Sequence, residues 1–187
     1  MSRTNLIIVS GSPGSGKTTL ARKLGDALGF PVIARDAIKE VLMNGMPPAS
    51  RQESMRLGGA SWPMMYGVLD TLIGRVPGVI IESNFRRGIS EPELVPRVNR
   101  CHAIVLHCTA RWGTIESRIQ ARQGDPNRHQ GHFDQVALVD VRRDFEKGQF
   151  DPLDLDLSSV VVETTDSYHP MFDDLVEIIE RRVDSGN

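Results

Sequence analysis

The stretch that decides the fold runs from Leu6 to Leu24 and reads LIIVSGSPGSGKTTLARKL. Its first residues form an apolar, β-branched run that is typical of a buried parallel strand, and its last residues are typical of a helix. The turn between them has the spacing Gly-x-x-x-x-Gly-Lys-Thr, which is the phosphate-loop motif in the strand-to-helix setting that the motif requires. The sequence therefore predicts a site for a nucleoside triphosphate at this turn.

The residue types in this loop suit that chemistry. The loop glycines let backbone amides turn inward where side chains would collide, and these amides attract anionic oxygens together with the helix N-terminus behind them. Lys17 is expected on the β- and γ-phosphates, and the Thr18 hydroxyl on Mg2+. The alternative is a glycine-rich turn without a ligand. The expected nucleotide contacts in the loop are Gly11, Ser12, Pro13, Gly14, Ser15, Gly16, Lys17, Thr18 and Thr19.

The composition is that of an ordinary globular chain. The 187 residues are 40% hydrophobic and 25% charged, which fits one domain over residues 1–187 with a sizeable core. A net charge of -2 singles out no polyanionic partner. Cys101 and Cys108 stand at the ends of a predicted strand, roughly 23 Å apart, and cannot bridge along it. With no signal peptide and no bilayer-length apolar run, we expect a cytoplasmic protein without membrane contact.

Short apolar runs alternate with helical patterns along the chain. This alternation predicts a three-layer α/β/α fold around a five-stranded parallel sheet. The helix expected around Pro63 is the least clear, because that proline and the pair Gly58–Gly59 interrupt it. The predicted strands are Leu6–Ser10, Val32–Arg35, Gly78–Glu82, His102–His107 and Ser159–Glu163. The predicted helices are Gly16–Leu28, Ala37–Met43, Ser50–Arg75, Glu91–Arg97, Thr114–Arg122, Phe133–Lys147 and Pro170–Val183.

The second strand leads into the run PVIARDAIKEVL, which places Asp36 where the strand ends and a helix begins. Ligands of parallel sheets bind outside the carboxyl ends of the strands. An aspartate there can accept the proton of an attacking hydroxyl and align it with the γ-phosphate. The alternative is that Asp36 is only the N-cap of the helix, and the spacing alone does not decide between these roles, which are not exclusive.

The third strand, in GVIIESNFRRG, ends in Glu82, Ser83 and Asn84. An acid at the end of a hydrophobic strand beside the phosphate loop resembles a Walker B position, where it would hold water around Mg2+ or orient the acceptor. A surface salt bridge is the alternative for Glu82. Arg86 and Arg87 follow at the expected acceptor side, where they either bind an anionic acceptor or face solvent.

A third informative stretch, RWGTIESRIQARQGDPNRHQGHFD, predicts a lid over residues 111–132. Arg118 and Arg122 share one helical face, and Arg128 follows a turn. Forked arginines on a mobile lid can supply positive charge to the γ-phosphate in the transition state, although a solvated helix face is the alternative. His129 and His132 suggest zinc only weakly, because no cysteine or acid cluster accompanies them.

Taken together, GSPGSGKTTLARKL and RDAIKE resemble the small P-loop kinases of the polynucleotide kinase, zeta toxin, chloramphenicol phosphotransferase and gluconate kinase group. The resemblance implies the sheet order 2-3-1-4-5, ATP as the nucleotide, and Asp36 as general base. It implies more weakly that Lys39 binds substrate. Compared with polynucleotide kinases, Ala37 replaces a second acid and Lys39 replaces an arginine, which puts a polynucleotide substrate in doubt.

The same resemblance extends to three other segments. The run Arg128–His132 is similar to the lid of that group, which often reads Arg-His-x-x-His, and ESNF suits its third strand. A threonine after the last strand lies beside the adenine in that group, so Thr164 and Thr165 are implied there, with plain turn chemistry as the alternative. The insertion at 44–77 helps form the acceptor site in that group; its cluster Trp62, Met64, Met65 and Tyr66 either lines that site or belongs to the core.

The expected function is transfer of the γ-phosphate of Mg-ATP to a hydroxyl group of a small-molecule acceptor. Three alternatives stay open: a 5′-hydroxyl polynucleotide acceptor, a nucleotide-dependent switch or assembly ATPase, and nucleotide binding without turnover. A missing Asn-Lys-x-Asp motif argues against a switch GTPase, and a missing Asp-Glu pair against a motor ATPase. The expected catalytic residues are Lys17, Asp36, Arg118, Arg122 and Arg128. The expected substrate contacts are Asp36, Lys39, Glu82, Asn84 and Arg86, with Thr18 and Glu82 as the metal ligands and Thr165 at the base.

Overall fold

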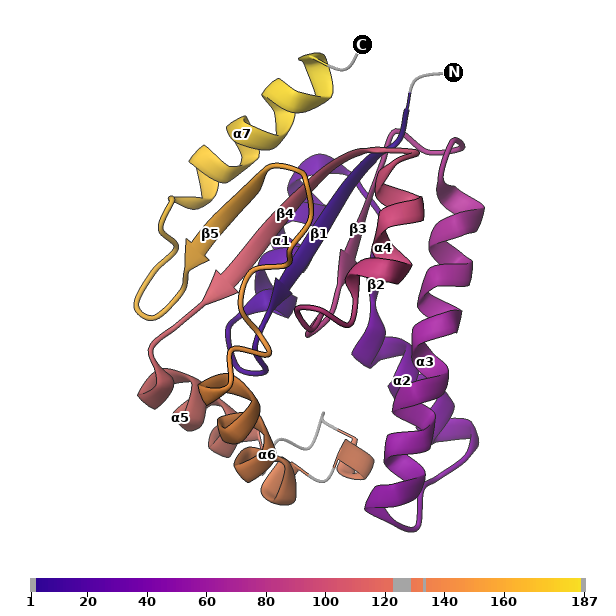
Figure 1. Cartoon of the computed structure of the whole chain (residues 1–187), viewed down its shortest axis with the longest axis vertical. Coiled ribbons are helices and arrows are strands. Elements are labelled where there is room, and N and C mark those ends of the chain that lie inside the picture. The colour runs from indigo at the N-terminus through magenta and orange to yellow at the C-terminus, as the bar shows by residue number, and fades with distance from the viewer. Residues whose placement is uncertain (1–2, 123–128, 133, 186–187) are drawn as a thin grey trace.

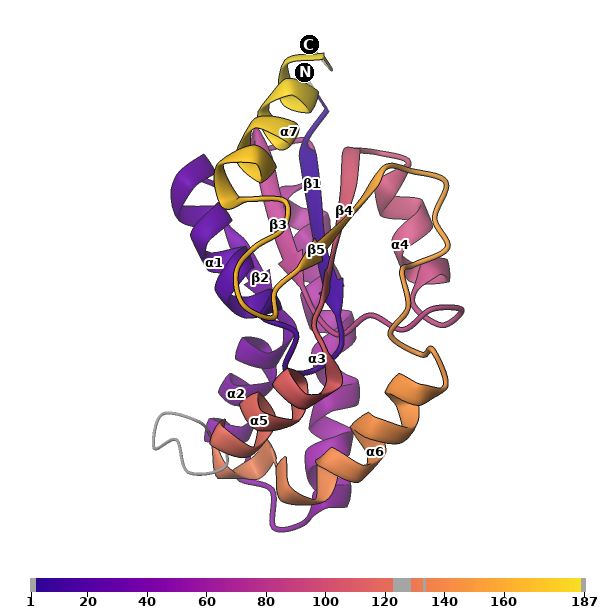
Figure 2. The ribbon, with the colours of Figure 1, turned by 90° about the vertical axis from the view of Figure 1, so that its left-hand side faces the viewer.

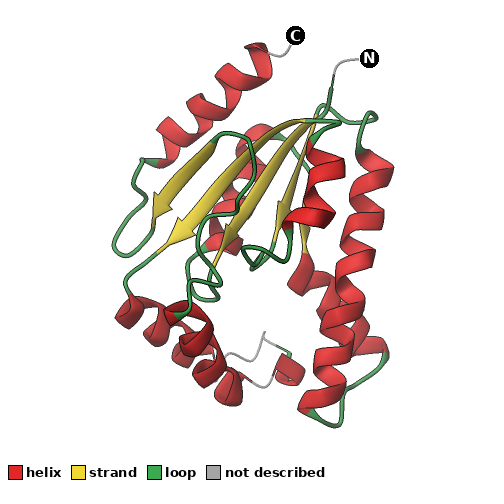
Figure 3. Cartoon of the chain, viewed as in Figure 1, coloured by secondary structure: helices red, strands yellow, loops and turns green. Residues whose placement is uncertain are grey.

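The computed structural model describes residues 3–122, 129–132 and 134–185. Strands and helices alternate along most of the chain, as the sequence predicts (Figure 3). The strands are β1 (Asn5–Gly11), β2 (Val32–Ala34), β3 (Gly78–Glu82), β4 (His102–Thr109) and β5 (Ser159–Glu163). The helices are α1 (Lys17–Leu28), α2 (Arg35–Gly45), α3 (Arg51–Leu72), α4 (Glu91–Val98), α5 (Trp112–Arg122), α6 (Asp134–Glu146) and α7 (Phe172–Ser185), with a 3-10 turn, η1 (Gln130–His132).

The five strands form one parallel sheet in the order β2-β3-β1-β4-β5, which confirms the expected fold class and strand order (Figure 1). The central strand β1 is buried along its whole length and pairs with β3 on one side and β4 on the other. This burial explains why its sequence is apolar without alternation, since a helical layer covers each face. All five strands point their carboxyl ends toward the same edge, where the phosphate loop begins.

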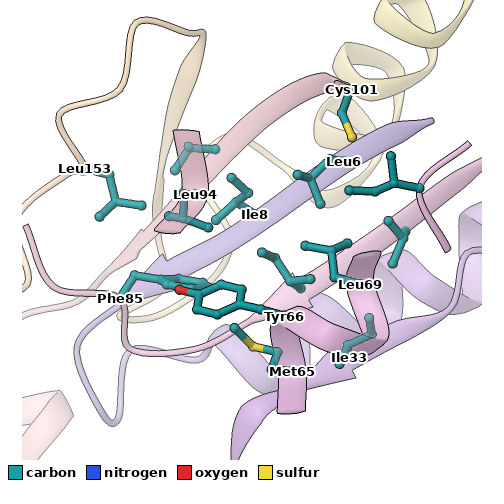
Figure 4. Close-up of a cluster of buried hydrophobic side chains, with 14 residues drawn as sticks. Leu6, Ile8, Ile33, Met65, Tyr66, Leu69, Phe85, Leu94, Cys101 and Leu153 are labelled. Atoms are coloured by element: carbon teal, nitrogen blue, oxygen red, sulfur yellow. The ribbon is translucent and has the colours of Figure 1, made fainter. Parts of the chain in front are cut away.

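Two hydrophobic cores lie on opposite faces of the sheet because successive strand residues point to opposite sides. On one face, Leu6 and Ile8 of β1 pack with Met65 and Leu69 of α3 and with Leu94 of α4 (Figure 4). On the other face, Ile7 and Val9 of β1 pack with side chains of α1 and α7, namely Leu20, Leu24, Leu175 and Ile179. Figure 2 shows the sheet between these two layers.

Helix α3 continues through Pro63, which settles the least clear part of the predicted secondary structure. A proline inside a helix removes one backbone hydrogen bond to the residue four positions earlier, here Gly59. Both residues lie on the exposed face of α3, so water can reach the carbonyl that loses its partner. The aromatic and methionine cluster is divided by the same geometry: Met65 and Tyr66 are buried in the core, whereas Met64 is 45% exposed.

Two helical arms extend beyond the carboxyl edge of the sheet. One arm is the pair α2 and α3, and the other is the pair α5 and α6 (Figure 1). The second arm has its own small core of Ile115 and Ile119, against which Leu138, Val141 and Phe145 pack. None of the described helices is both long enough and apolar enough to span a bilayer.

Candidate active site

The phosphate loop links β1 to α1 and depends on glycine at two positions for different reasons. Gly11 has φ +136°, and a Cβ atom there would lie 2.1 Å from the carbonyl oxygen of Cys108 on β4. Gly16 is the N-cap of α1 with φ +84°, a left-handed conformation that other residues adopt at a cost. The backbone can therefore turn tightly over the end of the sheet and direct its amides inward.

Lys17 is buried inside this loop, with 7% of its surface exposed. Its Nζ donates to the carbonyl oxygen of Ser12 at 2.9 Å. Burial lowers the pKa of the ammonium group, while the negative charges of Glu82 and Asp36 oppose that shift. The cation thus lies at the centre of the loop, where a phosphate-loop motif binds the β- and γ-phosphates.

Glu82, at the end of β3, faces the first turn of α1. The Thr18 hydroxyl donates to Glu82 Oε2 at 3.0 Å, and Glu82 is only 4% exposed, so a surface salt bridge is excluded for this residue. Burial raises the pKa of the Glu82 carboxyl, and the Lys17 charge works against this. A hydroxyl and a carboxylate at one point are the oxygen donors that Mg2+ prefers, so these two residues fit the predicted metal site.

Asp36 lies in the first turn of α2, and its carboxylate faces the same region. The N-cap of α2 is Ala34, without a side-chain cap, so Asp36 is not the N-cap that the sequence left as an alternative. The predicted strand ended at Arg35, but the helix begins there. Arg35 Nη2 donates to Asp36 Oδ1 at 2.8 Å. The side chain of Lys39, one turn later on α2, lies against α3. A Cβ atom added at Gly58 of α3 would be 3.6 Å from the lysine Cε.

One cavity of about 200 Å³ brings these groups together. Its phosphate-loop side is formed by Pro13, Gly14, Gly16, Lys17 and Thr18. The opposite side, which we call the acceptor wall, is formed by Arg35, Asp36, Lys39, Ser83 and Asn84. Glu82, Ile119, Arg122, His132 and Val141 complete the lining. Sequence reasoning gave no role to Arg35 or Ser83, although each directly adjoins a residue that it singled out.

A second cavity, of about 610 Å³, lies on the other side of the loop and shares Gly16 and Arg122 with the first. Its remaining lining comes from Thr19, Lys23, Arg118, Ala121, Thr164, Asp166, Ser167 and Tyr168. Because the two cavities meet at the phosphate loop, the second is the candidate place for the nucleoside. Lys23 Nζ lies 5.3 Å from the centre of the Tyr168 ring, a cation–π contact.

The two threonines after β5 differ in position. Thr164 lines the nucleoside cavity and donates through Oγ1 to the carbonyl oxygen of Ser15 at 2.9 Å. Thr165 is not among the lining residues of that cavity; its hydroxyl donates to Glu163 Oε1 at 2.5 Å and accepts from the backbone amide of Arg111 at 3.0 Å. A base contact by either threonine stays a prediction, and of the two only Thr164 lines this cavity.

The predicted lid arginines, Arg118 and Arg122, have different surroundings. Arg118 donates to the carbonyl oxygen of Gly14 at 3.2 Å and to that of Thr164 at 2.6 Å, so it joins the phosphate loop to the loop after β5. Arg122 lines both cavities, where its charge faces the space expected for phosphate. Arg128 lies outside the described residues. Arg118 and Arg122 therefore do not form a merely solvated helix face.

Arg86 is not among the residues that line the two cavities. Its Nη2 donates to Asp144 Oδ2 on α6 at 2.7 Å, and its guanidinium lies over the Phe150 ring at 5.7 Å. These contacts fasten the segment after β3 to α6. Its neighbour Arg87 has an exposed side chain. A substrate contact by Arg86 stays a prediction, and its observed partners assign it a structural role.

The two histidines that follow the lid helix make separate contacts. His132 lines the first cavity, with its Nε2 2.9 Å from Glu40 Oε1 on α2. His129 Nδ1 accepts from the backbone amide of Gly131 at 3.0 Å. Among residues 3–122, 129–132 and 134–185, no group of three or more His, Cys, Asp or Glu side chains is arranged to hold a metal ion.

The fold and this site define a class of protein. A phosphate loop after the central strand, an aspartate after β2, and a helical arm carrying arginines toward the loop are the parts of a small P-loop kinase. The family described as AAA domain matches residues 6–147, and the chain belongs to that family. The expected resemblance to the small P-loop kinase group is confirmed.

Three solved structures are similar to this chain. A protein from Chloroflexus aurantiacus J-10-fl, provisionally named a kinase, is 29% identical with a TM-score of 0.85, over 96% of this chain and 98% of that chain. A gluconokinase from Sinorhizobium meliloti 1021 is 18% identical with a TM-score of 0.57, over 99% and 97%. A sugar kinase from Janibacter sp. HTCC2649 is 20% identical with a TM-score of 0.55, over 97% and 95%. The latter two share the fold. A comparison with curated proteins finds no match.

Proposed function

We propose that this protein transfers the γ-phosphate of ATP to a hydroxyl group of a small-molecule acceptor. The observation that carries the proposal is the composition of the first cavity: Lys17 and Thr18 form one side, and Asp36 faces them from the acceptor wall. A triphosphate bound by the loop would present its last phosphoryl group to this space. An acceptor bound against Asp36 would present its hydroxyl to the same phosphorus.

In the proposed reaction, the acceptor oxygen forms a bond to the γ-phosphorus while the bond from that phosphorus to the β–γ bridging oxygen breaks. The electron pair of the broken bond leaves with ADP, and the hydroxyl proton passes to the Asp36 carboxylate. Burial works to raise the pKa of that carboxyl, but the Arg35 charge and hydrogen bond, together with the charges of His132 and Lys17, hold the pKa well below its usual value. Asp36 is therefore ionised at neutral pH and able to accept a hydrogen bond from the hydroxyl.

A carboxylate with so low a pKa is a weak base, which bears on its role. Phosphoryl transfer passes through a loose transition state in which the attacking hydroxyl keeps its proton until late. Alignment of the hydroxyl is then the larger contribution of Asp36, and proton acceptance follows as the new bond completes. The Asp36 side chain lines the cavity and is 49% exposed, so an acceptor has access to it.

The positive groups around the phosphate loop would act on the transferred phosphoryl group. Lys17 and Arg122 line the cavity, and Arg118 holds the loop itself through the Gly14 carbonyl. Arg128, beyond the described residues, is proposed to add further charge. Thr18 and Glu82 would hold Mg2+, which when bound neutralises charge on the β- and γ-phosphates.

The proposed test measures γ-labelled ATP turnover with Mg2+ and pooled acceptors. The pools are a 5′-hydroxyl oligonucleotide, nucleosides, hydroxylated antibiotics, and sugars with sugar acids, the last included because of the kinases named above. The Asp36→Asn variant is the test, and Asp144→Asn is a matched control, because Asp144 also pairs with an arginine, at 2.7 Å, but does not line the cavity. We expect the Asp144→Asn control to transfer label to one small-molecule pool. We expect the Asp36→Asn variant to transfer none.

Other outcomes point to the remaining alternatives. Label on the oligonucleotide, with binding that weakens steeply as salt rises, would replace the small molecule by a polynucleotide. Release of inorganic phosphate alone, at one rate in every pool and in the Asp36→Asn variant, would contradict the transfer and favour a nucleotide-dependent switch. We also propose a cytoplasmic location, which the two free cysteine thiols support.

A further inference from the structure

Arg35 is placed unusually firmly for a charged residue beside a cavity. Only 14% of its side chain is exposed, and its Cζ lies 4.8 Å from the centre of the Trp62 ring on α3. An arginine that stacks on an indole keeps its planar fork in one orientation, because rotation would lose the cation–π contact. From that position its Nη2 reaches Asp36 Oδ1 at 2.8 Å.

The indole belongs to a rigid aromatic platform formed by Trp62, Tyr66 and Phe85. The Trp62 ring stacks on Tyr66 with centres 6.0 Å apart, and it meets Phe85 at 5.5 Å. Tyr66 and Phe85 belong to the core on the α3 side of the sheet, and both are drawn in Figure 4. The platform therefore joins Arg35 to the well-packed centre of the protein.

We propose that Arg35 is a positioning residue for Asp36: stacked on Trp62, it holds the Asp36 carboxylate toward the phosphate loop so that the acceptor hydroxyl meets a fixed, ionised partner. This inference rests on the function proposed above. It also assigns a role to α3 in the reaction. The helix would act through Trp62 and Arg35, without Trp62 being among the residues that line the cavity.

The charges around Asp36 come from every element packed against it. They are Arg35, Lys39 and Glu40 on α2, Lys17 on α1, Glu82 on β3, Arg122 on α5 and His132 on η1. Burial works to raise the pKa of Asp36, and Arg35 is the first of the charges that oppose it, ahead of His132 and Lys17. Removal of Arg35 should therefore raise the pKa of the Asp36 carboxyl back toward the ordinary aspartate range.

Arg97 provides a matched control on the same platform. Its Cζ lies 4.4 Å from the centre of the Tyr66 ring, and it pairs with Asp70 at 2.8 Å. Its side chain is also 14% exposed. It differs from Arg35 in lying away from Asp36 and outside the lining of the cavity. A change at Arg97 should therefore disturb the platform as much as a change at Arg35 does, but not the Asp36 carboxylate.

The experiment is a carbon-13 NMR titration of the Asp36 carboxyl in labelled full-length protein, with the resonance assigned by its loss in Asp36→Asn. It needs no acceptor, so it succeeds or fails independently of the proposed transfer reaction. We expect the parent resonance to stay in its ionised position from about pH 8 down to about pH 3. In Arg35→Gln it should titrate at least about one pH unit above the parent, and in Arg97→Gln it should match the parent.

Two further variants keep the test valid if Arg35→Gln does not fold. Arg35→Lys keeps the charge but loses the fork, and Trp62→Leu removes the stacking surface. Each should raise the Asp36 pKa by less than Arg35→Gln would, with Arg97→Gln unchanged. The inference is overturned if the Asp36 titration is the same in all Arg35 and Trp62 variants that fold. It is equally overturned if Arg97→Gln moves the titration as far as they do.

Kinetics with the acceptor found by the labelling assay add a second readout. Arg35→Gln should lower kcat by about 10- to 100-fold while KM for Mg-ATP changes by less than about threefold, because a misplaced carboxylate affects alignment and not nucleotide binding. The loss should deepen as the pH falls toward the raised pKa. An equal loss of kcat at every pH would contradict the proposal.

Discussion

The phosphate loop and the acceptor wall face each other across one cavity, yet they are assembled differently. The loop takes its lining from the continuous stretch between β1 and α1, and its shape depends on backbone conformation at glycines. The acceptor wall takes its residues from α2 and from the segment after β3, and Arg35 depends in addition on Trp62 of α3. The first region is a property of local sequence, whereas the second exists only when distant elements pack together.

The largest expected effect is on the loop side. Lys17→Ala should lower transfer by about 1,000-fold and also weaken or misalign Mg-ATP, because it removes the buried cation at the centre of the loop. Calorimetric binding of Mg-ATP and the labelling assay would measure the two effects. Full activity in this variant would remove the basis for placing phosphate in the loop.

A change on the acceptor wall should separate transfer from nucleotide binding. Asp36→Asn should lower kcat by at least ~100-fold, because it removes both the anionic partner that aligns the hydroxyl and the group that accepts its proton, and it should leave Mg-ATP affinity close to that of the parent. The same binding and transfer assays measure this contrast with Lys17→Ala. Transfer at the parent rate would show that the Asp36 carboxylate is not needed and that the two regions do not cooperate as proposed.

The nucleoside cavity offers a comparison between adjacent residues. Thr164→Val removes a buried hydroxyl that donates to Ser15 O and accepts from Arg118 Nη1, so Mg-ATP affinity should fall by about tenfold. Thr165→Val is the control, because its hydroxyl contacts Glu163 and Arg111, none of the three lines the cavity, and its loss should change affinity by less than about twofold. Equal effects of the two substitutions would place the nucleoside elsewhere.

The smallest effect is expected at Arg86. Its ion pair with Asp144 is partly exposed and joins two surface segments, so Arg86→Gln should change kcat/KM by less than about threefold and lower stability only slightly. Steady-state kinetics with the identified acceptor and thermal unfolding would measure both quantities. A tenfold rise in acceptor KM would instead restore Arg86 as a substrate contact and extend the acceptor wall beyond the observed cavity.

Sequence reasoning was most successful where the signal is local. The spacing from Gly11 to Thr18 requires only a strand, a turn and a helix in succession, and the structure has them in that order. It was less successful where two interpretations of the same residues differ only in how the side chains pack. Pro63 looked like an interruption, but it lies on the exposed side of α3 and is tolerated there. Neighbouring threonines looked equivalent, but only Thr164 lines the nucleoside cavity.

Two arginines near the site have contacts that the local sequence does not reveal. Arg35 received no role, because its stacking partner Trp62 lies 27 positions away along the chain and meets it only through the packing of α2 on α3. Arg86 is expected at the acceptor, which stays a prediction, and the structure adds a partner that the sequence did not indicate, the Asp144 carboxylate 58 positions later. In neither case does the local sequence contain the partner.

The sequence by itself determined the phosphate loop, the parallel sheet order by resemblance, and the position of Asp36 at the carboxyl edge of the sheet. The loop and the position of Asp36 follow from backbone conformation and hydrophobic periodicity, which act over a few neighbouring residues, whereas the sheet order is implied only by the family resemblance. Only the tertiary structure decided that Glu82 is buried against Thr18, that Arg118 joins two loops, and that Trp62 holds Arg35 beside Asp36. Such contacts form only when packing brings side chains from distant parts of the chain within a few ångströms of each other. A local sequence pattern contains no information about these distances.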